Sequence, residues 1–272
     1  MALLTQIVAN YLRTLHLLQS ADYVMFAIDV LKNRKANKLF LAGHTDFIPP
    51  LAHLAYDAYN HTNWQLYYDM GLSHARLISD LTREHVSGDG IRICEWGCGP
   101  ARIIRHLGEI PGFTRVELSG TDYNEETIAW CKKNIADVHF AKTGLEPPLP
   151  FETGALDCVY AISVFTHLSE RMHYAWIEEL FRIIRQDGIL IFTTHGDTCA
   201  RRLLPADRKK YDSGSLVIKS QVEEGKKHYV AYHPPQFIKN KLLQNHVVIR
   251  HISVPSEYDM EQEVWVVRKG EM

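Results

Sequence analysis

The stretch RICEWGCGPARIIRHL, residues 92–107, holds the residues of this chain best suited to bind a ligand. A short apolar run contains the carboxylate Glu95, and two closely spaced glycines, Gly97 and Gly99, follow before a helical pattern begins. Glycines at the end of a strand let the backbone turn sharply and let a ligand lie against the main chain. The stretch therefore predicts a ligand-binding loop at the mouth of a strand.

The composition of this loop limits its ligand. A dinucleotide-binding loop reads G-x-G-x-x-G, but Arg102 stands at the third glycine position, and the P-loop pattern is absent from the sequence. Glu95 precedes Gly97 by two residues, where it would repel a pyrophosphate. The loop instead suits a cationic or hydroxyl-bearing ligand.

A second carboxylate, Asp122, ends the segment VELSGTD about 25 residues after Gly97. A carboxylate there can accept hydrogen bonds from both hydroxyls of an adenosine ribose. Nicotinamide enzymes share that geometry, so Asp122 alone does not identify the ligand. Glu95 and the missing third glycine argue against a dinucleotide.

The elements that must position these residues change in kind along the chain. Residues 1–88 show the three- and four-residue apolar spacing of helices, first over Leu3–Leu15 and again over Asp22–Lys35, and the turn SGDG at 87–90 closes this part. From residue 91, short apolar runs alternate with helical patterns, which is typical of βαβ units and a mainly parallel sheet. The expected strands lie at IRICEW, RVELSGTDYN, VHF, LDCVYAISVF, ILIFTTH, HVVIRHISV and EQEVWVVRK.

The predicted fold is therefore α/β, a Rossmann-like seven-stranded sheet with flanking helices and an N-terminal helical cap. Its expected division is a helical extension over 1–88 and a Rossmann-like domain over 89–272. A hairpin insertion is expected around 213–233, where two β-rich runs flank the turn VEEGKK.

Four segments, in order and at suitable spacing, resemble the class I S-adenosylmethionine-dependent methyltransferases. ICEWGCGPAR is similar to the first motif of that family, GTDYN to the end of its second strand, and GLEPPLPF to its adenine-side loop. LDCVYAISVFTHLSE is similar to its fourth strand and the turn after it. The resemblance spans roughly residues 91–268 and is nearest to members with a helical N-terminal extension, which act on small molecules.

This resemblance implies S-adenosyl-L-methionine as the cofactor and assigns residues to it. Gly97, Cys98 and Gly99 would line its methionine and ribose, with Glu95 near the methionine ammonium. Asp122 would hold the ribose. The remaining contacts would be Tyr123, Gly144 and Leu145 around the adenine, and Ser163 under the methionine.

Two histidines are candidates for catalysis, because imidazole can take up or release a proton near physiological pH. His167 follows the fourth expected strand and His195 the fifth, so both face the side where an acceptor would arrive. An alternative is that they are structural. No spacing of Asp, Glu, His and Cys indicates a metal, and no metal is expected.

The aromatic segment YDAYNHTNWQLYYDMG, residues 56–71, has two interpretations. It can be ordinary helix packing, or its aromatic side chains can roof the site. The second interpretation gives the expected roof residues Tyr56, Trp64, Tyr67 and Tyr68, because an extension without strands of its own would cover the open strand ends.

Composition bounds the partners. The net charge of −2 gives no basic surface overall, so nucleic acid is not expected as a partner. No apolar run reaches the length of a membrane span, about 18 residues. The five cysteines form no C-x-x-C pair, and the expected setting is the reducing cytoplasm.

The expected function is transfer of a methyl group from S-adenosylmethionine to an oxygen or nitrogen of a small molecule, such as a metabolite, sugar or natural product. Two alternatives stay open: a protein that binds S-adenosylmethionine without transferase activity, and a nicotinamide-dependent oxidoreductase. The acceptor, the choice between O- and N-methylation, and the oligomeric state do not follow from the sequence.

Overall fold

The N-terminal part of the protein is helical. The computed structural model describes residues 18–88, 90–111, 113, 115–220, 222–258 and 260–270. Within them, three helices precede the sheet: α2 (Leu18–Gly43), α3 (Ala52–Tyr59) and α4 (Trp64–His85). The helix expected over Leu3–Leu15 lies outside the described residues. The one expected over Asp22–Lys35 continues to Gly43 and ends before Pro49 and Pro50, which disfavour helix in the residue before them.

Hydrogen bonds tie α2 to the turn before α4. Asp29 Oδ2 accepts from the backbone N–H of Thr62 at 2.6 Å and from its hydroxyl at 2.7 Å. Asn37 Oδ1 accepts from Trp64 N at 2.8 Å, and Asn63 caps α4 by accepting from Leu66 N. The side chains of α2 therefore fix where α4 begins.

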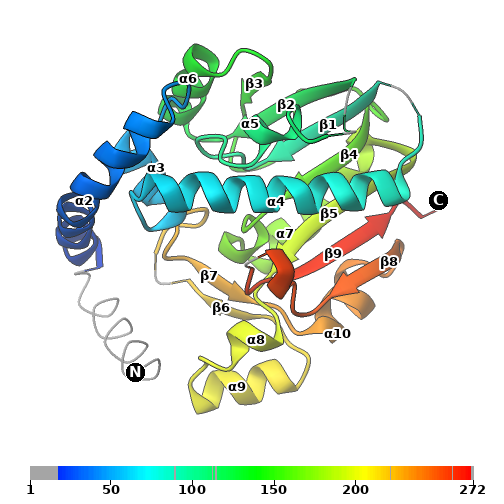
Figure 1. The fold of residues 1–272 in the computed structure, drawn as a ribbon. Helices are drawn as coiled ribbons and strands as arrows, with labels where there is room; N and C mark the ends of the chain where they lie inside the picture. Colours follow the sequence, from blue (N-terminus) through cyan, green and yellow to red (C-terminus); the bar gives the residue numbers. More distant parts are fainter. Residues whose placement is uncertain are drawn as a thin grey trace.

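A seven-stranded sheet forms the centre of the molecule, with the strand order β3-β2-β1-β4-β5-β9-β8 (Figure 1). The strands are β1 (Ile91–Trp96), β2 (Val116–Asp122), β3 (His139–Lys142), β4 (Leu156–Ala161), β5 (Ile184–Thr194), β8 (Val247–Ile252) and β9 (Glu263–Arg268). β9 runs antiparallel to both β5 and β8, and the pairings from β3 to β5 are parallel. This arrangement confirms the predicted Rossmann-like fold.

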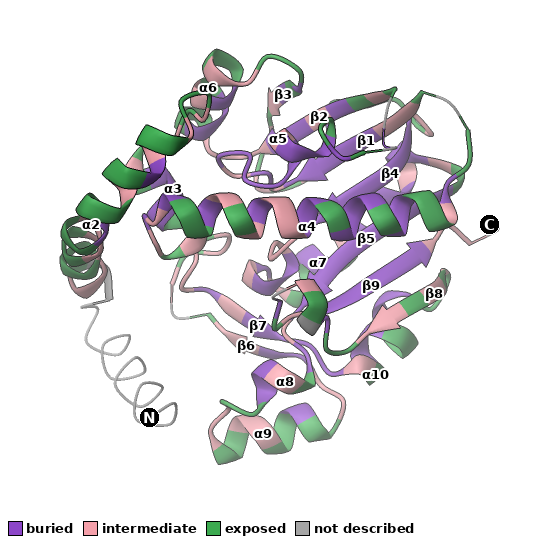
Figure 2. Cartoon of the chain, viewed as in Figure 1, coloured by how far each residue is buried: buried purple, intermediate pink, exposed green. Residues whose placement is uncertain are grey.

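Helices cover both faces of the sheet. The helix α4 crosses one face (Figure 1), and its Leu77, Ile78 and Leu81 join one core cluster with Ile93 and Ile191. On the other face, α7 (Glu170–Ile183) contributes Trp176 and Leu180 to a second cluster. Figure 2 shows buried sheet strands beneath the half-exposed α4. The shorter α5 (Ile104–Leu107) and α6 (Glu125–Asn134) follow β1 and β2.

The helix α7 is shorter than expected. The pattern of SERMHYAWIEELFRIIRQDG predicts a helix that stops at Gly188, but α7 ends at Ile183 and β5 begins at Ile184. The early strand is stabilised by pairing of Ile184 with Leu156 and by an ion pair of Arg185 Nε with Asp157 Oδ1 at 2.5 Å. Tertiary pairing therefore overrides the local helical pattern there.

Beyond β5 the chain forms a small separate layer. The strands β6 (Val217–Lys219) and β7 (Val230–Tyr232) pair antiparallel in a sheet of their own, in the segment where a hairpin was expected. The short helices α8 (Asp197–Ala200) and α9 (Pro205–Asp212) precede it, and α10 (Pro235–Phe237) follows. His233 N donates to His195 O at 2.8 Å, so this layer returns directly to the end of β5.

Candidate active site at the carboxyl ends of the strands

A pocket lies where β1, β2 and β4 end, the place where open parallel sheets bind ligands. Its walls include Glu95, Gly97, Gly99, Asp122, Gly144 and Ser163. The structure therefore gathers residues from four separate sequence segments around one cavity. All six were expected from the sequence to contact the cofactor.

The glycine loop has a backbone that few other residues could adopt. Gly97 has φ 73° and Gly99 has φ 49°, both in the left-handed region. The N–H groups of Gly97 and Cys98 donate to Thr121 O at 2.8 and 3.0 Å, which pins the loop to the end of β2. A Cβ built on Gly97 would overlap Cγ2 of Val164. The loop can lie this close to the turn after β4 only because Gly97 has no side chain.

We expect Gly97→Ala to lower the affinity for S-adenosylhomocysteine at least about tenfold, because a strained residue of this kind costs about 1–3 kcal/mol before any overlap is counted. Calorimetry on purified protein measures this. Gly108→Ala is the matched control, since Gly108 has φ −65° and its nearest neighbour, Leu118 Cδ1, is 4.0 Å from the built Cβ. Equal affinities of the two variants would contradict the assigned role of the loop.

Glu95 lies at the floor of the pocket and is 3% exposed. Its Oε2 accepts from Tyr160 OH at 3.0 Å and from the N–H of Ile104, the first residue of α5, at 3.1 Å. Burial raises the pKa of Glu95 to about 8, although both hydrogen bonds lower it. Glu95 is therefore mostly protonated at neutral pH and can gain charge when a cationic group arrives.

Asp122 connects the end of β2 to the glycine loop. Its Oδ2 accepts from Gly99 N at 2.9 Å, and its Oδ1 accepts from Asn124 N at 2.8 Å. Burial raises the pKa of Asp122, and the backbone N–H groups oppose that shift. Each oxygen keeps a lone pair for a further donor, so the carboxylate can still accept two hydroxyl groups.

Tyr123, Gly144 and Leu145 line the expected adenine side of the pocket. Tyr123 OH donates to Gly225 O at 3.1 Å, and Leu145 O accepts from Trp176 Nε1 at 3.1 Å. These contacts fix both walls of this side.

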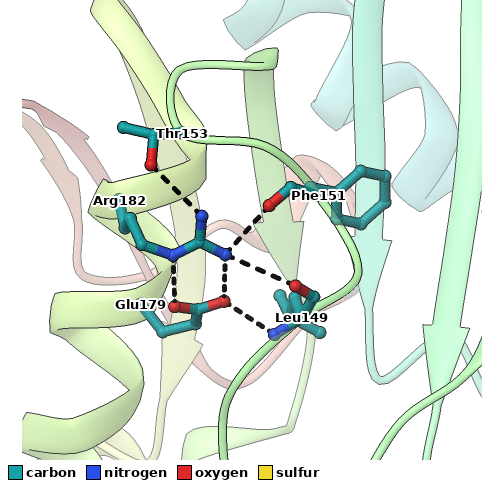
Figure 3. Close-up of polar contacts among 5 residues, drawn as sticks. All are labelled: Leu149, Phe151, Thr153, Glu179 and Arg182. Atoms are coloured by element: carbon teal, nitrogen blue, oxygen red, sulfur yellow. Dashed lines mark hydrogen bonds and ion pairs between the residues drawn. The ribbon is translucent and has the colours of Figure 1, made fainter.

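An ion pair on α7 holds the chain that follows this adenine-side loop (Figure 3). Arg182 and Glu179 form two contacts of 2.7 Å. Glu179 Oε1 accepts from Leu149 N at 2.6 Å, and Arg182 donates to Phe151 O at 3.0 Å. The Arg182–Glu179 ion pair therefore anchors residues 149–151, which follow Leu145, to the core helix α7.

Ser163 stands at the turn after β4 with φ 63°, a strained value for a residue other than glycine. Its N–H donates to Thr193 Oγ1 at 2.8 Å, and its hydroxyl accepts from Gln262 Nε2 at 2.5 Å. Strand β5 and Gln262, the residue before β9, thus hold Ser163 in the pocket wall.

The two candidate histidines differ in position. His167 lines the pocket, whereas His195 is absent from its wall. His167 Nδ1 lies 2.7 Å from Tyr229 O, so this nitrogen carries the proton and Nε2 has the free lone pair. His195 Nδ1 lies 3.1 Å from Ala231 O, and Gln262 Nε2 lies 3.4 Å from its Nε2. Burial lowers the pKa of both imidazoles, that of His195 to about 4.

Cys98 contributes only its backbone to the loop. It is 1% exposed and belongs to the core cluster under the sheet face. Burial raises the pKa of its thiol well above the ordinary value, so the thiol is protonated and unreactive.

The expected roof residues lie elsewhere. Trp64 and Tyr67 form an aromatic cluster with Phe40, Tyr68 packs against this cluster, and the pocket wall contains none of Tyr56, Trp64, Tyr67 or Tyr68. Tyr67 is fully buried and donates to Pro100 O at 2.7 Å, so it supports the glycine loop from behind. Trp64, Tyr67 and Tyr68 therefore take part in helix packing, the other of the two interpretations.

The roof is instead built from α3 and the hairpin layer. Leu54, Asp57, Ala58 and Tyr59 of α3 line the pocket, together with Gly225 and Lys227. Lys227 Nζ forms an ion pair with Asp22 Oδ2 at 2.7 Å and lies 4.1 Å from the ring centre of Tyr56. Tyr59 lies in the same aromatic segment as the expected roof residues, but it was not among those predicted to line the site.

Residues 18–88, 90–111, 113, 115–220, 222–258 and 260–270 contain no group of three or more His, Cys, Asp or Glu side chains arranged to hold a metal ion. Over the same ranges, every helix is too short or too polar to cross a membrane.

The strand order and the strand-end pocket define a Rossmann-like, cofactor-binding α/β protein. Residues 94–192 match the family model of the methyltransferase domain. A malonyl-[acyl-carrier protein] O-methyltransferase of Bacillus anthracis is 30% identical over 129 residues, 47% of this chain and 46% of that protein. The chain thus spans about half the length of this curated relative.

Solved structures share the fold. Phosphoethanolamine N-methyltransferase 1 of Haemonchus contortus aligns with a TM-score of 0.55 at 16% identity, over 88% of this chain and 49% of that one. The 1,6-didemethyltoxoflavin-N1-methyltransferase of Burkholderia thailandensis aligns with a TM-score of 0.52 at 12% identity, over 74% and 79%. Residues 94–192 therefore match a methyltransferase domain, and the chain shares the fold of these two methyltransferases.

Proposed function

We propose that the protein transfers the methyl group of S-adenosylmethionine to an oxygen or nitrogen of a small molecule. The observation that carries the proposal is the cover over the glycine loop: α3 and residues Gly225 and Lys227 close the pocket from above. A covered pocket suits a small acceptor better than a polymer such as nucleic acid. Residues 1–88 would then act as the cap of a domain over 89–272.

The residues of the pocket fit the cofactor. Gly97 and Gly99 leave a cradle beside the main chain, because Cβ atoms there would meet Val164 and Tyr59. Asp122 offers two carboxylate oxygens for a ribose, and Glu95 can take the charge that complements an ammonium. Tyr123 would lie against the adenine. When bound, S-adenosylmethionine supplies a methyl group activated by its sulfonium.

The task of the protein is then to align the acceptor and to exclude water. The roof from α3 shields the pocket, and Ser163 shapes its floor below the expected methionine end. His167 presents the lone pair of Nε2, so it can take a proton from an acceptor hydroxyl or ammonium. A metal is not part of this scheme.

The relatives support both kinds of acceptor atom. The Bacillus anthracis relative is named as an O-methyltransferase, and both solved structures above are named as N-methyltransferases. All five cysteines are free and buried, which supports the proposed cytoplasmic setting.

Two measurements test the proposal. Calorimetry should show micromolar binding of S-adenosylhomocysteine that NAD does not displace. Incubation with S-adenosylmethionine labelled in its methyl group and a small-molecule extract should then release labelled, methylated products. Saturable NAD binding without any response to S-adenosylhomocysteine would overturn the assignment. Cofactor binding without transfer to any acceptor would favour a binding protein.

We also expect cofactor binding to release up to about one proton at pH 7, because Glu95 would ionise beside the ammonium. Its raised pKa of about 8 means that the carboxyl is largely protonated beforehand. In calorimetry, the binding enthalpy should therefore depend on the ionisation enthalpy of the buffer. Glu95→Gln should remove that dependence, and a wild-type enthalpy that is the same in all buffers would contradict this role.

A further inference from the structure

Arg102 is a buried cation in the wall of the pocket. Its residue is 7% exposed, and it directly follows Ala101 at the end of the glycine loop. The centre of its guanidinium lies 4.1 Å from the ring centre of Tyr59, and its Nη1 lies 4.0 Å from Met70 Sδ. Among the described residues, its Nε has no hydrogen-bond partner.

The surroundings of Arg102 do not neutralise it. No described carboxylate lies within ion-pair distance of its guanidinium, whereas Arg182 and Arg185 each have such a partner. His61 and His74 are close enough to feel its charge, and both are uncharged: burial, and then Arg102, lowers their pKa to about 4 and about 3. A buried cation without a counterion is costly, so this wall is complementary to an anion.

The nature of the anion follows from Glu95. Glu95 lines the same pocket and interacts electrostatically with Arg102, yet the two form no ion pair. A guanidinium and a carboxyl that ionises beside an ammonium, facing one cavity separately, are complementary to a zwitterion. An α-amino acid group has this character, whereas a phosphate group has no ammonium for Glu95 to bind.

We propose that Arg102, stacked on Tyr59, binds the carboxylate of an amino-acid group at the glycine-loop end of the pocket. This inference rests on the proposed function, because that function supplies such a group in the methionine end of the cofactor. An amino-acid acceptor beside the cofactor would present the same chemistry. The contact with the Tyr59 ring holds the guanidinium in the pocket wall, and its planar set of N–H groups can bind both oxygens of a carboxylate.

The test compares two ligands that share the adenosine part. S-adenosylhomocysteine carries the amino-acid group, whereas 5′-methylthioadenosine lacks it. In Arg102→Gln, we expect the affinity for S-adenosylhomocysteine to fall about 10- to 100-fold, and the affinity for methylthioadenosine to change less than about threefold. Arg102→Lys should show an intermediate loss. A merely structural role of Arg102 would lower both affinities together.

Arg105→Gln is the matched control. Arg105 lies one turn further on, donates to Ile48 O at 3.1 Å and is absent from the pocket wall. It should bind both ligands as the wild type does.

The second arm addresses the acceptor as the source of the carboxylate. Glycine is titrated onto wild type and Arg102→Gln, both loaded with S-adenosylhomocysteine. Unchanged S-adenosylhomocysteine affinity in Arg102→Gln, with glycine binding lost, would assign the carboxylate to an acceptor. If Arg102→Gln alters neither selectivity nor glycine binding, the inference fails while the proposed function stands. If the wild type binds neither adenosine ligand, the proposed function itself fails.

Discussion

Asp122→Ala should weaken S-adenosylhomocysteine binding by about a hundredfold or more. The expected ribose contacts are two charge-assisted hydrogen bonds, each worth about 1.5–3 kcal/mol. The substitution also removes the acceptor that holds Gly99 N at 2.9 Å, so the glycine loop loses an anchor. Calorimetry measures the dissociation constant, and thermal unfolding measures the stability.

The structure adds a cost in stability that the ribose argument alone would miss. Because Asp122 accepts from two backbone N–H groups, its removal leaves Gly99 N and Asn124 N without that partner, and the melting temperature should fall. Asp122→Asn tests the charge at nearly constant shape. An unchanged dissociation constant in Asp122→Ala would show that the ribose lies elsewhere.

The dependence on pH gives an independent check. The carboxylate must be ionised to accept two hydroxyls, and burial raises the pKa of Asp122 above its ordinary value. Affinity should therefore fall as the pH drops, and the fall should begin at a higher pH than an ordinary aspartate would give. Asp122→Asn should remove this part of the pH dependence.

The sheet and its glycine loop were predictable because their signals are local. β1, β4 and the second half of β5 are short apolar runs beside a turn or a helix, and alternation of strand and helix permits few topologies. Gly97, Gly99 and Asp122 follow directly from where strands end. Their meeting in one pocket needs no knowledge of the rest of the chain.

The roof depends on packing between distant segments, which no local pattern encodes. Trp64, Tyr67 and Tyr68 share the face of α4 that packs against α2, so their aromatic character serves the helix interface. Tyr59 reaches the pocket because α3 ends at Tyr59, with Asn60 following in the left-handed conformation. Gly225 lies 102 residues beyond Tyr123 in the sequence, and the hydrogen bond between them holds it at the pocket.

The role of Arg102 was also not predictable from the sequence. In the sequence it was notable only as the residue that replaces a glycine of the dinucleotide pattern. The structure shows that its guanidinium lies beside Tyr59 and Met70, both from the N-terminal helices, and has no carboxylate partner among the described residues. A departure from a motif can therefore mark a residue with a task of its own.

His167→Asn should reduce kcat by about 10²- to 10⁴-fold if the acceptor carries a proton into the reaction. The amide of asparagine can replace Nδ1–H as the donor to Tyr229 O, now at 2.7 Å, but it provides no base at the position of Nε2. Cofactor affinity should stay within about threefold, because the substitution preserves this contact. Steady-state kinetics with the identified acceptor, together with calorimetry, separates these two effects.

His195→Asn is the matched control for this prediction. Its imidazole also donates through Nδ1, to Ala231 O at 3.1 Å, but its Nε2 faces Gln262 and it is absent from the pocket wall. The loss of kcat should therefore be smaller.

Burial lowers the pKa of His167, so the unprotonated base persists below pH 6.5, and the acid limb of the wild-type kcat/KM profile should lie below that value. An unchanged kcat in His167→Asn would show that His167 is not the base. The acceptor would then lose its proton to water, and the protein would contribute mainly by aligning the reactants.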